Sequence, residues 1–283
     1  MNYPEPILKK LQETEVAALK RFDEVCRKNG LEYTIDGGTC LGAIRHDGHF
    51  IPWDDDIDVA MKADELKKLL SHHADEFGPE YRLRTYKDSD YYLFWPKLCV
   101  EGTRFQDADA LAAGYRQGIF VDIFPMVRVS SDPKIAHRQR KRAVFWQRMA
   151  YIKAVRTPKF ESSMPHARIF SAVCTVAHFT VAKLFSRSFV ERRFWAAYDE
   201  SADGPWVNAC SIIGAPRPSE VMYPPSELTF EGLRVMAPSN PVKYLENVYG
   251  DWKRMPPPEK RHMHAPVVLD LGDGVNVVDG PLG

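Results

Sequence analysis

The chain of 283 residues carries no net charge, because 38 Lys and Arg balance 38 Asp and Glu. Without an overall positive field there is little to attract a polyanion, and we expect no nucleic-acid partner. The balance conceals one basic stretch, residues 130–195, where fourteen Lys and Arg accompany three acidic residues for a local charge of +11. Two interpretations of this stretch stay open: the solvated face of a helix, or peripheral contact with anionic lipid.

Cysteine is scarce, and the five residues include no Cys-x-x-Cys pair: Cys26, Cys40, Cys99, Cys174 and Cys210. This odd, scattered set argues against a disulfide framework and a zinc ribbon, and favours a reducing compartment. The first residues lack the basic and then apolar pattern of a secretory signal. The longest apolar run, at 169–182, is shorter than the about 20 residues that cross a bilayer as a helix. We therefore expect a cytoplasmic protein, with any membrane contact peripheral and at the inner face.

Internal repeats are absent, and 45% apolar and 12% aromatic residues indicate an ordered globular chain. Hydrophobic spacing predicts helices at 5–28, 40–45, 63–77 and 241–249, strands at 31–35, 55–61, 81–85, 91–98 and 118–123, and a hairpin across Glu231-Gly232. Residues 131–200 read as three helices. We expect an α/β (α+β) fold with a mixed sheet, divided into a catalytic core at 1–129, a basic helical insertion at 130–200 and a C-terminal segment at 201–283 that completes the core.

Acidic residues are concentrated in one short segment, WDDDIDVA at residues 53–60. In a β-strand side chains alternate between faces, so Asp54, Asp56 and Asp58 would share one face. Asp55 would point away and is expected in a solvated acidic turn, or it could instead cap the backbone or pair with Arg45. Three carboxylates on one face repel one another unless a cation lies among them. Mg²⁺, or Mn²⁺, takes oxygen ligands and often shares them with substrate phosphates. The segment therefore predicts a metal site for phosphate chemistry.

Two other segments fit this interpretation. Gly37, Gly38 and Thr39 lie at a predicted strand-to-helix turn, where glycine lets backbone N–H groups approach a phosphate. Asp122 is a single acid within an apolar strand, a costly placement unless the acid has a partner. It could complete the metal site, accept a proton from an acceptor hydroxyl, or pair with a basic residue.

Together these segments are typical of the nucleotidyltransferase fold, and their sequences closely resemble the LicD family of phosphotransferases, to which fukutin-type proteins are related. The resemblance rests on GGTCLGAIR at 37–45 and FIPWDDDID at 50–58, with weaker support from Lys97, VDIFP at 121–125 and YGDW at 249–252. It touches both ends of the chain but not the helical middle.

The resemblance implies a set of roles. Asp56, Asp58 and Asp122 would be catalytic and hold the metal, with Asp54 also in the metal site. The implied substrate-binding residues are Gly37, Gly38, Thr39, Arg45, Trp53 and Lys97, of which Arg45 and Lys97 would meet phosphate charge. The implied reaction is Mg²⁺-dependent transfer of a phospho-alcohol, phosphocholine being favoured, from a CDP-alcohol donor to a hydroxyl of a cell-surface glycan precursor that could be lipid-linked.

Other interpretations stay open. The transferred group could be phosphoethanolamine, ribitol phosphate or a nucleotide, or the chain could be a non-enzymatic protein that binds divalent ions or a membrane surface. A calcium loop starting at Asp54 is disfavoured, because Val59 stands where the loop needs glycine. His262 and His264 are expected to be exposed and without a metal.

Overall fold

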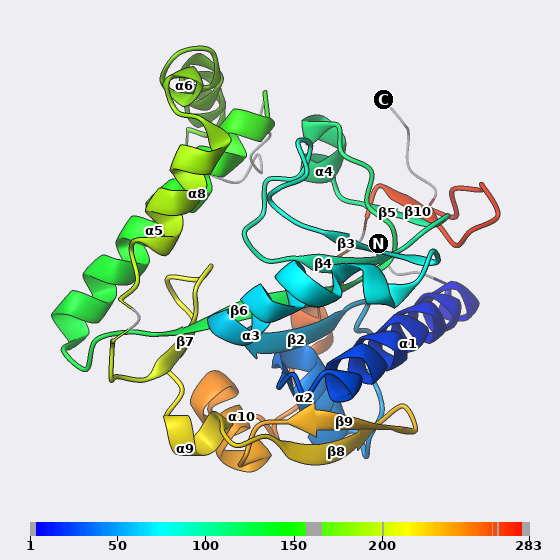
Figure 1. Ribbon diagram of the computed structural model, residues 1–283. Helices are drawn as coiled ribbons and strands as arrows, with labels where there is room; N and C mark the ends of the chain where they lie inside the picture. The colour runs from blue at the N-terminus through cyan, green and yellow to red at the C-terminus, as the bar shows by residue number, and fades with distance from the viewer. Residues whose placement is uncertain (1–3, 157–165, 200, 262, 265, 279–283) are drawn as a thin grey trace.

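The computed structural model describes residues 4–156, 166–199, 201–261, 263–264 and 266–278. Its α-helices are α1 (Glu5–Lys28), α2 (Gly37–Arg45), α3 (Ala63–Lys68), α4 (Ala108–Ala113), α5 (Pro133–Ala154), α6 (Ala167–Phe179), α7 (Val181–Leu184), α8 (Arg187–Trp195), α9 (Ser219–Met222) and α10 (Pro241–Tyr249). Its strands are β1 (Thr34–Ile35), β2 (Ile57–Lys62), β3 (Tyr81–Arg84), β4 (Lys97–Val100), β5 (Arg104–Gln106), β6 (Phe120–Arg128), β7 (Trp206–Asn208), β8 (Ser226–Phe230), β9 (Leu233–Ala237) and β10 (Val268–Asp270). Figure 1 shows their arrangement.

The central sheet has the strand order β1-β2-β6-β4-β3, and β7 pairs with the far end of β6. Strands β2 and β6 are parallel, whereas the other pairings in this sheet are antiparallel. Two smaller antiparallel pairs, β5 with β10 and β8 with β9, lie outside it. Helices combined with a mixed sheet confirm the α/β fold class expected from the sequence.

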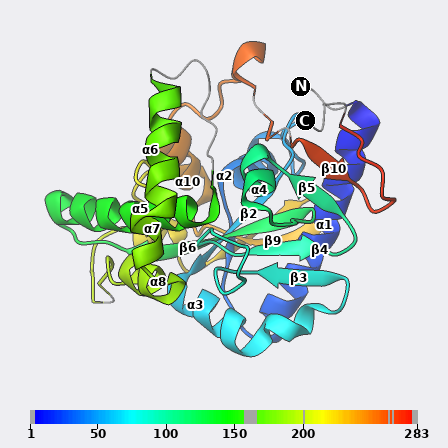
Figure 2. The same ribbon diagram turned by 90° about the horizontal axis from the view of Figure 1, so that it is seen from above.

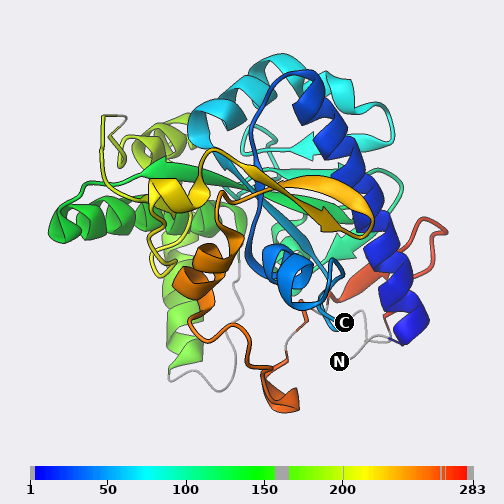
Figure 3. The same ribbon diagram turned by 90° about the horizontal axis from the view of Figure 1, so that it is seen from below.

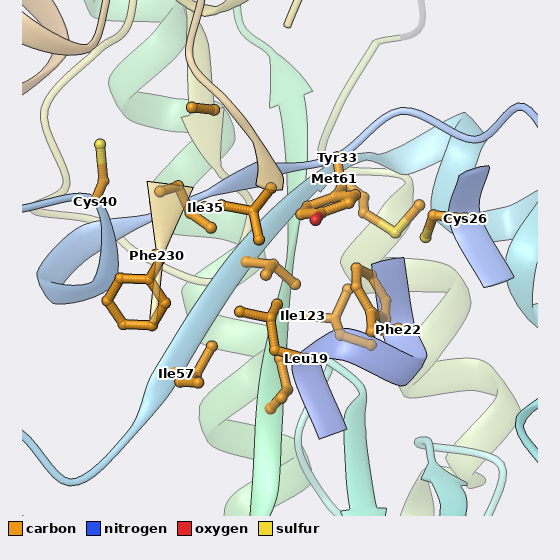
Figure 4. Close-up of a cluster of buried hydrophobic side chains, with 14 of the residues drawn as sticks. Leu19, Phe22, Cys26, Tyr33, Ile35, Cys40, Ile57, Met61, Ile123 and Phe230 are labelled. Atoms are coloured by element: carbon orange, nitrogen blue, oxygen red, sulfur yellow. The ribbon is translucent and has the colours of Figure 1, made fainter. Parts of the chain in front are cut away.

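The apolar core lies on one face of this sheet. Along β2, Ile57, Val59 and Met61 are fully buried there, because successive side chains of a strand point to opposite faces. Helices α1 and α2 and the β8–β9 hairpin cover this face (Figure 3). Figure 4 shows Phe22 of α1 and Phe230 of β8 packed around the strand residues. The alternate residues of β2 and β6 therefore point to the opposite face, where the acids lie.

Helices α5 to α8 occupy the chain between β6 and β7, strands that pair with each other. A second apolar cluster joins these helices to the sheet, and in it the rings of Phe94 and Phe194 stack with centroids 4.2 Å apart. Helix α5 begins at an Asp132 cap whose side chain accepts hydrogen bonds from the Lys134 and Ile135 amides. Its later turns line the cavity that contains the acids.

Several predicted elements are confirmed, among them the helix at 5–28, the turn at 36–39, the hairpin and the helix at 241–249. The strand predicted at 91–98 is wrong over most of its length, since only Lys97–Val100 pairs. The aromatic residues before it form a turn in which the Tyr91 hydroxyl donates to the Trp95 carbonyl at 2.7 Å. The strand predicted at 55–61 starts only at Ile57. The alternation argument therefore does not apply to Asp54 and Asp56.

Candidate active site

Asp58 and Asp122 are direct neighbours on two parallel strands. The register of β2 and β6 pairs these two residues, so both side chains leave the same face of the sheet. Both line one cavity of about 640 Å³, and Asp56, from the segment just before β2, lines it too. The structure thus brings three of the four predicted metal ligands to one cavity, although Asp122 comes from a distant part of the chain.

Asp122 is held in a fixed orientation by two donors. Lys97, opposite it on β4, lies with Nζ 2.9 Å from Oδ1, and the Trp95 indole N–H donates to the same oxygen at 3.0 Å. Nζ of Lys97 also lies 3.2 Å from the centroid of the Phe120 ring, and the lysine is buried. The buried acid therefore has the basic partner that its apolar surroundings require. Lys97 also lines the cavity. Its predicted contact with a substrate phosphate stays a prediction.

Asp58 is an enclosed acid with little to compensate its charge. Its backbone N–H donates to the Thr39 hydroxyl at 2.9 Å, but its Oδ1 is buried and has no hydrogen-bond partner among the residues that the structure describes. Burial, followed by repulsion from Asp56 and Asp122, raises the pKa of Asp58 well above its ordinary value. A buried carboxylate oxygen without a partner is costly unless a proton or a cation satisfies it.

The neighbouring acids show the same perturbation. Burial, opposed by His264 and reinforced by Asp122, raises the pKa of Asp56 to about 6. Burial and repulsion from Asp56 raise the pKa of Asp54 to about 8. Carboxylates that repel one another around a shared space, one with an unpartnered oxygen, suit a hard divalent cation such as Mg²⁺ or Mn²⁺. The carboxylates of Asp56, Asp58 and Asp122 have the chemistry that such an ion needs. Among the described residues, however, the group whose ligand atoms all lie within 4.8 Å of one another is Asp55, Asp56 and His264.

Asp54 differs from these three acids, because it is not among the described residues that line the cavity. Its carboxylate packs against the glycine turn, where a Cβ on Gly38 would lie 2.5 Å from Oδ2 of Asp54. A Cβ on Gly37, whose φ is +51°, would lie 3.0 Å from Oδ2 of Asp58. The two glycines therefore make room for carboxylates, a role that the sequence analysis did not assign to them.

The same turn is anchored from the C-terminal part of the chain. The Gly37 amide donates to the Tyr244 hydroxyl at 2.8 Å, and that hydroxyl donates to Oδ1 of Asp36 at 2.5 Å. Arg217 completes the group, with Nη1 and Nη2 at 2.7 and 3.3 Å from the two carboxylate oxygens of Asp36. The Gly37 N–H is thus already used inside the protein, so a phosphate contact from this turn would have to come from later amides. Asp36, Arg217 and Tyr244 were missed, since no local pattern links residues so far apart in sequence.

His264 is exposed, as expected, but it also lies beside the acids. Its ring Nδ1 is 3.1 Å from Oδ1 of Asp55 and 3.6 Å from Oδ2 of Asp56. The hydrogen bond to Asp55 is the main cause that raises the pKa of His264 to about 9. Without a metal, a protonated His264 acts as a counter-charge for these acids. Once deprotonated, its imidazole could join Asp55 and Asp56 as a metal ligand, since the three groups lie within 4.8 Å of one another. The expectation of a solvated turn is wrong for Asp55, which is fully buried and accepts hydrogen bonds from the His264 backbone N–H at 2.9 and 3.0 Å. His262 lies outside the described residues.

Arg45 and Trp53 are not among the described residues that line the cavity. Nη1 of Arg45 donates to the Trp252 carbonyl at 3.0 Å. The Trp53 ring is covered by the guanidinium of Arg261, whose central carbon lies 4.5 Å from the ring centroid. Substrate contacts by Arg45 and Trp53 therefore stay predictions. In the structure Arg45 joins the C-terminal segment to α2, and Trp53 joins it to the acidic segment.

Comparison with known proteins supports the resemblance. The profile described as LicD/FKTN/FKRP, nucleotidyltransferase domain, matches residues 30–164, which contain β1 to β6 and every acid of the cavity cluster. Residues 30–164 therefore carry a domain of the LicD family. The lipopolysaccharide cholinephosphotransferase LicD of Haemophilus influenzae is 27% identical over 260 residues, covering 87% of this chain and 91% of that protein. Uncharacterized proteins of Rickettsia typhi and Rickettsia prowazekii are 34% and 38% identical over 86 residues, which are 29% of this chain.

Proposed function

We propose that this chain is a phosphotransferase that moves phosphocholine from a CDP-activated donor to a hydroxyl of a glycan, with Mg²⁺ or Mn²⁺ as cofactor. The observation that carries the proposal is the pairing of Asp58 with Asp122 at a cavity that Asp56 also lines. The name of the Haemophilus influenzae relative, a lipopolysaccharide cholinephosphotransferase, supports the transferred group and a lipid-linked glycan as acceptor.

Asp56, Asp58 and Asp122 would hold the metal, which when bound neutralises charge on the donor diphosphate. The acceptor hydroxyl attacks the phosphorus that carries the alcohol, the bond from that phosphorus to the CMP oxygen breaks, and CMP leaves. The hydroxyl proton passes to a carboxylate of the cluster. Lys97 keeps Asp122 in one orientation and places an ammonium group at the cavity wall, where it meets phosphate charge.

The direct test is CMP release from CDP-choline in the presence of Mg²⁺ and a lipopolysaccharide-type glycan. We expect Asp58→Asn to reduce the rate by about a thousandfold, equivalent to about 4 kcal/mol of transition-state stabilisation. Asp64→Asn is the matched control, because Asp64 lies exposed at the start of α3, just after β2. Near-normal turnover by a folded Asp58→Asn protein would contradict the proposal.

Product analysis separates the rival functions. The mass added to the glycan distinguishes phosphocholine from phosphoethanolamine, ribitol phosphate and a nucleotide. A non-enzymatic ion-binding or membrane-binding protein predicts metal or vesicle binding without consumption of any CDP-linked donor. The buried Lys97–Asp122 pair inside an acidic cavity favours catalysis, since a simple ion-binding site has no need of a competing cation.

A further inference from the structure

The cavity has an aromatic wall besides its acids, which we define as Tyr92, Trp95, Tyr115, Phe124 and Tyr151. Ring centroids of Tyr92 lie 5.7 Å from Tyr115 and 5.5 Å from Tyr151. Trp95 joins this wall to the acids, because its ring lies 5.7 Å from Phe124 and its N–H donates to Asp122. Aromatic rings and the metal-site carboxylates therefore face one continuous space.

The aromatic wall also carries its own negative charge. Asp107 and Asp109 line the cavity, and the Tyr151 hydroxyl donates to Oδ1 of Asp109 at 3.0 Å. The cations that line the whole cavity are fewer than the acids. Among the described residues, the lining acids are Asp56, Asp58, Asp107, Asp109 and Asp122, and the lining basic residues are Lys97, Arg148 and His264. The aromatic part of the cavity is thus suited to a positively charged group.

Aromatic faces next to carboxylates are the usual protein environment for a quaternary ammonium ion. Such an ion donates no hydrogen bond, so it gains more from ring faces than from polar side chains. A neutral polyol headgroup would instead require several donors and acceptors. These properties distinguish choline from ribitol and glycerol by chemistry alone.

We propose that the aromatic wall, with Asp109, binds the cationic headgroup of the donor alcohol and so determines which alcohol is transferred. This inference rests on the proposed function and adds residues that the acid cluster does not include. Asp109 and the ring faces supply the negative charge that attracts the headgroup. Loss of either should therefore weaken binding of a CDP-alcohol with a quaternary ammonium group more than binding of one with a neutral headgroup.

The test compares CDP-choline, CDP-ethanolamine and CDP-ribitol with the wild-type chain and three variants. Tyr151→Leu removes a ring, Asp109→Asn removes a charge, and Tyr151→Phe keeps the ring as the matched control. We expect Tyr151→Leu and Asp109→Asn to raise KM for CDP-choline roughly five- to thirtyfold with a smaller effect on kcat, which is the range of one cation–π contact. Tyr151→Phe should raise KM for CDP-choline less than Tyr151→Leu does.

A binding measurement without turnover separates this inference from the proposed function. Calorimetry with tetramethylammonium should show binding to the wild-type chain and to Tyr151→Phe, weakened in Tyr151→Leu. Phe124→Leu provides a second variant if Tyr151→Leu does not fold. An equal rise of KM for all three CDP-alcohols, or a change only in the KM for the glycan, would overturn the headgroup assignment. Neither result would contradict the proposed phosphotransferase function. Absence of turnover of any CDP-alcohol would instead contradict the proposed function.

A different observation concerns α6, which Figure 2 shows at the edge of the molecule, away from the central sheet. Ile169, Val173 and Val176 on α6 are 62, 59 and 63% exposed. Their spacing of four and three residues places them on one stripe of the helix. Leu184 on α7, the helix that follows α6, is 79% exposed. Apolar side chains gathered in this way mark a contact surface.

Cations flank this surface. The guanidinium carbon of Arg156 and Nζ of Lys183 lie 5.1 and 5.3 Å from the centroid of the Phe179 ring at the end of α6, and both basic residues are exposed. An apolar stripe bordered by cations is typical of a helix that lies in the interface of an anionic bilayer. No single helix in the described part of the chain is long and apolar enough to span a membrane, although the bent pair Ile169–Leu184 and Arg187–Trp195 passes the same test of length and composition.

We infer that the α6 stripe docks on an anionic lipid surface, where a lipid-linked acceptor would be found. The test is co-sedimentation with vesicles of phosphatidylglycerol and phosphatidylethanolamine, compared with phosphatidylcholine alone. We expect binding to the anionic vesicles that falls at least about tenfold in Val173→Asp/Val176→Asp and weakens at high salt. Val275→Asp is the control, since Val275 is a similarly exposed apolar residue outside α6.

Two results would overturn this second inference. One is vesicle binding that the α6 double variant leaves unchanged. The other is a concentration-dependent dimer in light scattering that the double variant disrupts while vesicle binding is absent, which would assign the stripe to a second copy of the chain. Activity on a soluble glycan gives an independent control, because the double variant should retain it.

Discussion

Asp58 and Asp122 lie side by side on parallel strands, and Lys97 approaches Asp122 from the strand on the other side. This order places a buried cation next to one acid and leaves the other with an unpartnered oxygen. The two acids are therefore not equivalent. Asp122 is oriented by the protein itself, whereas Asp58 requires a proton or an added cation.

The stability of the metal-free protein should fall as pH rises. The pKa of Asp56 is raised to about 6 and that of Asp54 to about 8, chiefly by burial. In the unfolded chain both groups ionise near pH 4, so between about pH 4 and pH 8 the folded state binds more protons. The unfolding free energy should therefore decrease through that window by several kcal/mol, because each unit of difference in pKa between the two states corresponds to about 1.4 kcal/mol.

Urea unfolding in EDTA across this pH range measures the effect. Because a divalent cation replaces the protons, added Mg²⁺ should stabilise the protein more at the alkaline end than at the acidic end. A stability that is flat with pH, or that increases toward the alkaline end without metal, would show that these acids are not held protonated by the fold.

Glu15 tests the same electrostatics from outside the cavity. This residue of α1 is 1% exposed, its Oε2 has no hydrogen-bond partner within the described ranges, and burial with repulsion from Asp56 raises its pKa well above the ordinary value. Burial therefore favours the neutral form of Glu15. Glu15→Gln should fold with a stability within about 1 kcal/mol of the wild type and lose less stability at alkaline pH. Destabilisation by several kcal/mol in chemical denaturation would indicate that the carboxylate is charged.

Lys97 and Asp122 should behave as a coupled pair. Lys97→Met leaves the buried Asp122 without its cation, which should cost about 3 kcal/mol of stability. Adding Asp122→Asn should restore most of this loss, while CMP release stays below about a thousandth of the wild-type rate. Denaturant midpoints of the two single variants and the double variant provide the cycle. If the stability losses of Lys97→Met and Asp122→Asn simply add in the double variant, the ion pair between Lys97 and Asp122 does not contribute to stability.

The glycine turn offers a matched comparison. Gly37 and Gly30 both have positive φ, at +51° and +62°, but only Gly37 has a carboxylate within reach of an added Cβ. Both alanine substitutions should cost about 1 kcal/mol in backbone strain. Only Gly37→Ala should also weaken Mn²⁺ binding, because its Cβ would displace Asp58. Equal metal affinities in the two variants would refute the idea that Gly37 makes room for that acid.

The sequence predicted local elements better than long-range partners. Spacing of apolar residues was enough for α1, and Glu231-Gly232 for the hairpin, because these signals are contained in a few neighbouring residues. Aromatic and β-branched residues misled the prediction at 91–98, where Tyr91 and Tyr92 pack against Tyr115 instead of joining a strand. Pairing of β5 with β10 was not foreseen, since it joins segments far apart in the chain.

The candidate site shows the same division. The acids themselves were found because several carboxylates in one short segment are unusual and costly. Their neighbours Trp95, His264 and the Asp36–Arg217 pair were not found, because each contact is created by tertiary folding. Arg45 and Trp53, selected from the family resemblance, contact C-terminal residues rather than the cavity.

Calorimetric titration of the wild-type chain, Asp58→Asn and Asp122→Asn with Mn²⁺ tests the central claim most directly. One ion should bind the wild-type chain, and both variants should lose at least about tenfold in affinity while melting as folded proteins. Unchanged Mn²⁺ affinity in Asp122→Asn would contradict a shared metal site between β2 and β6.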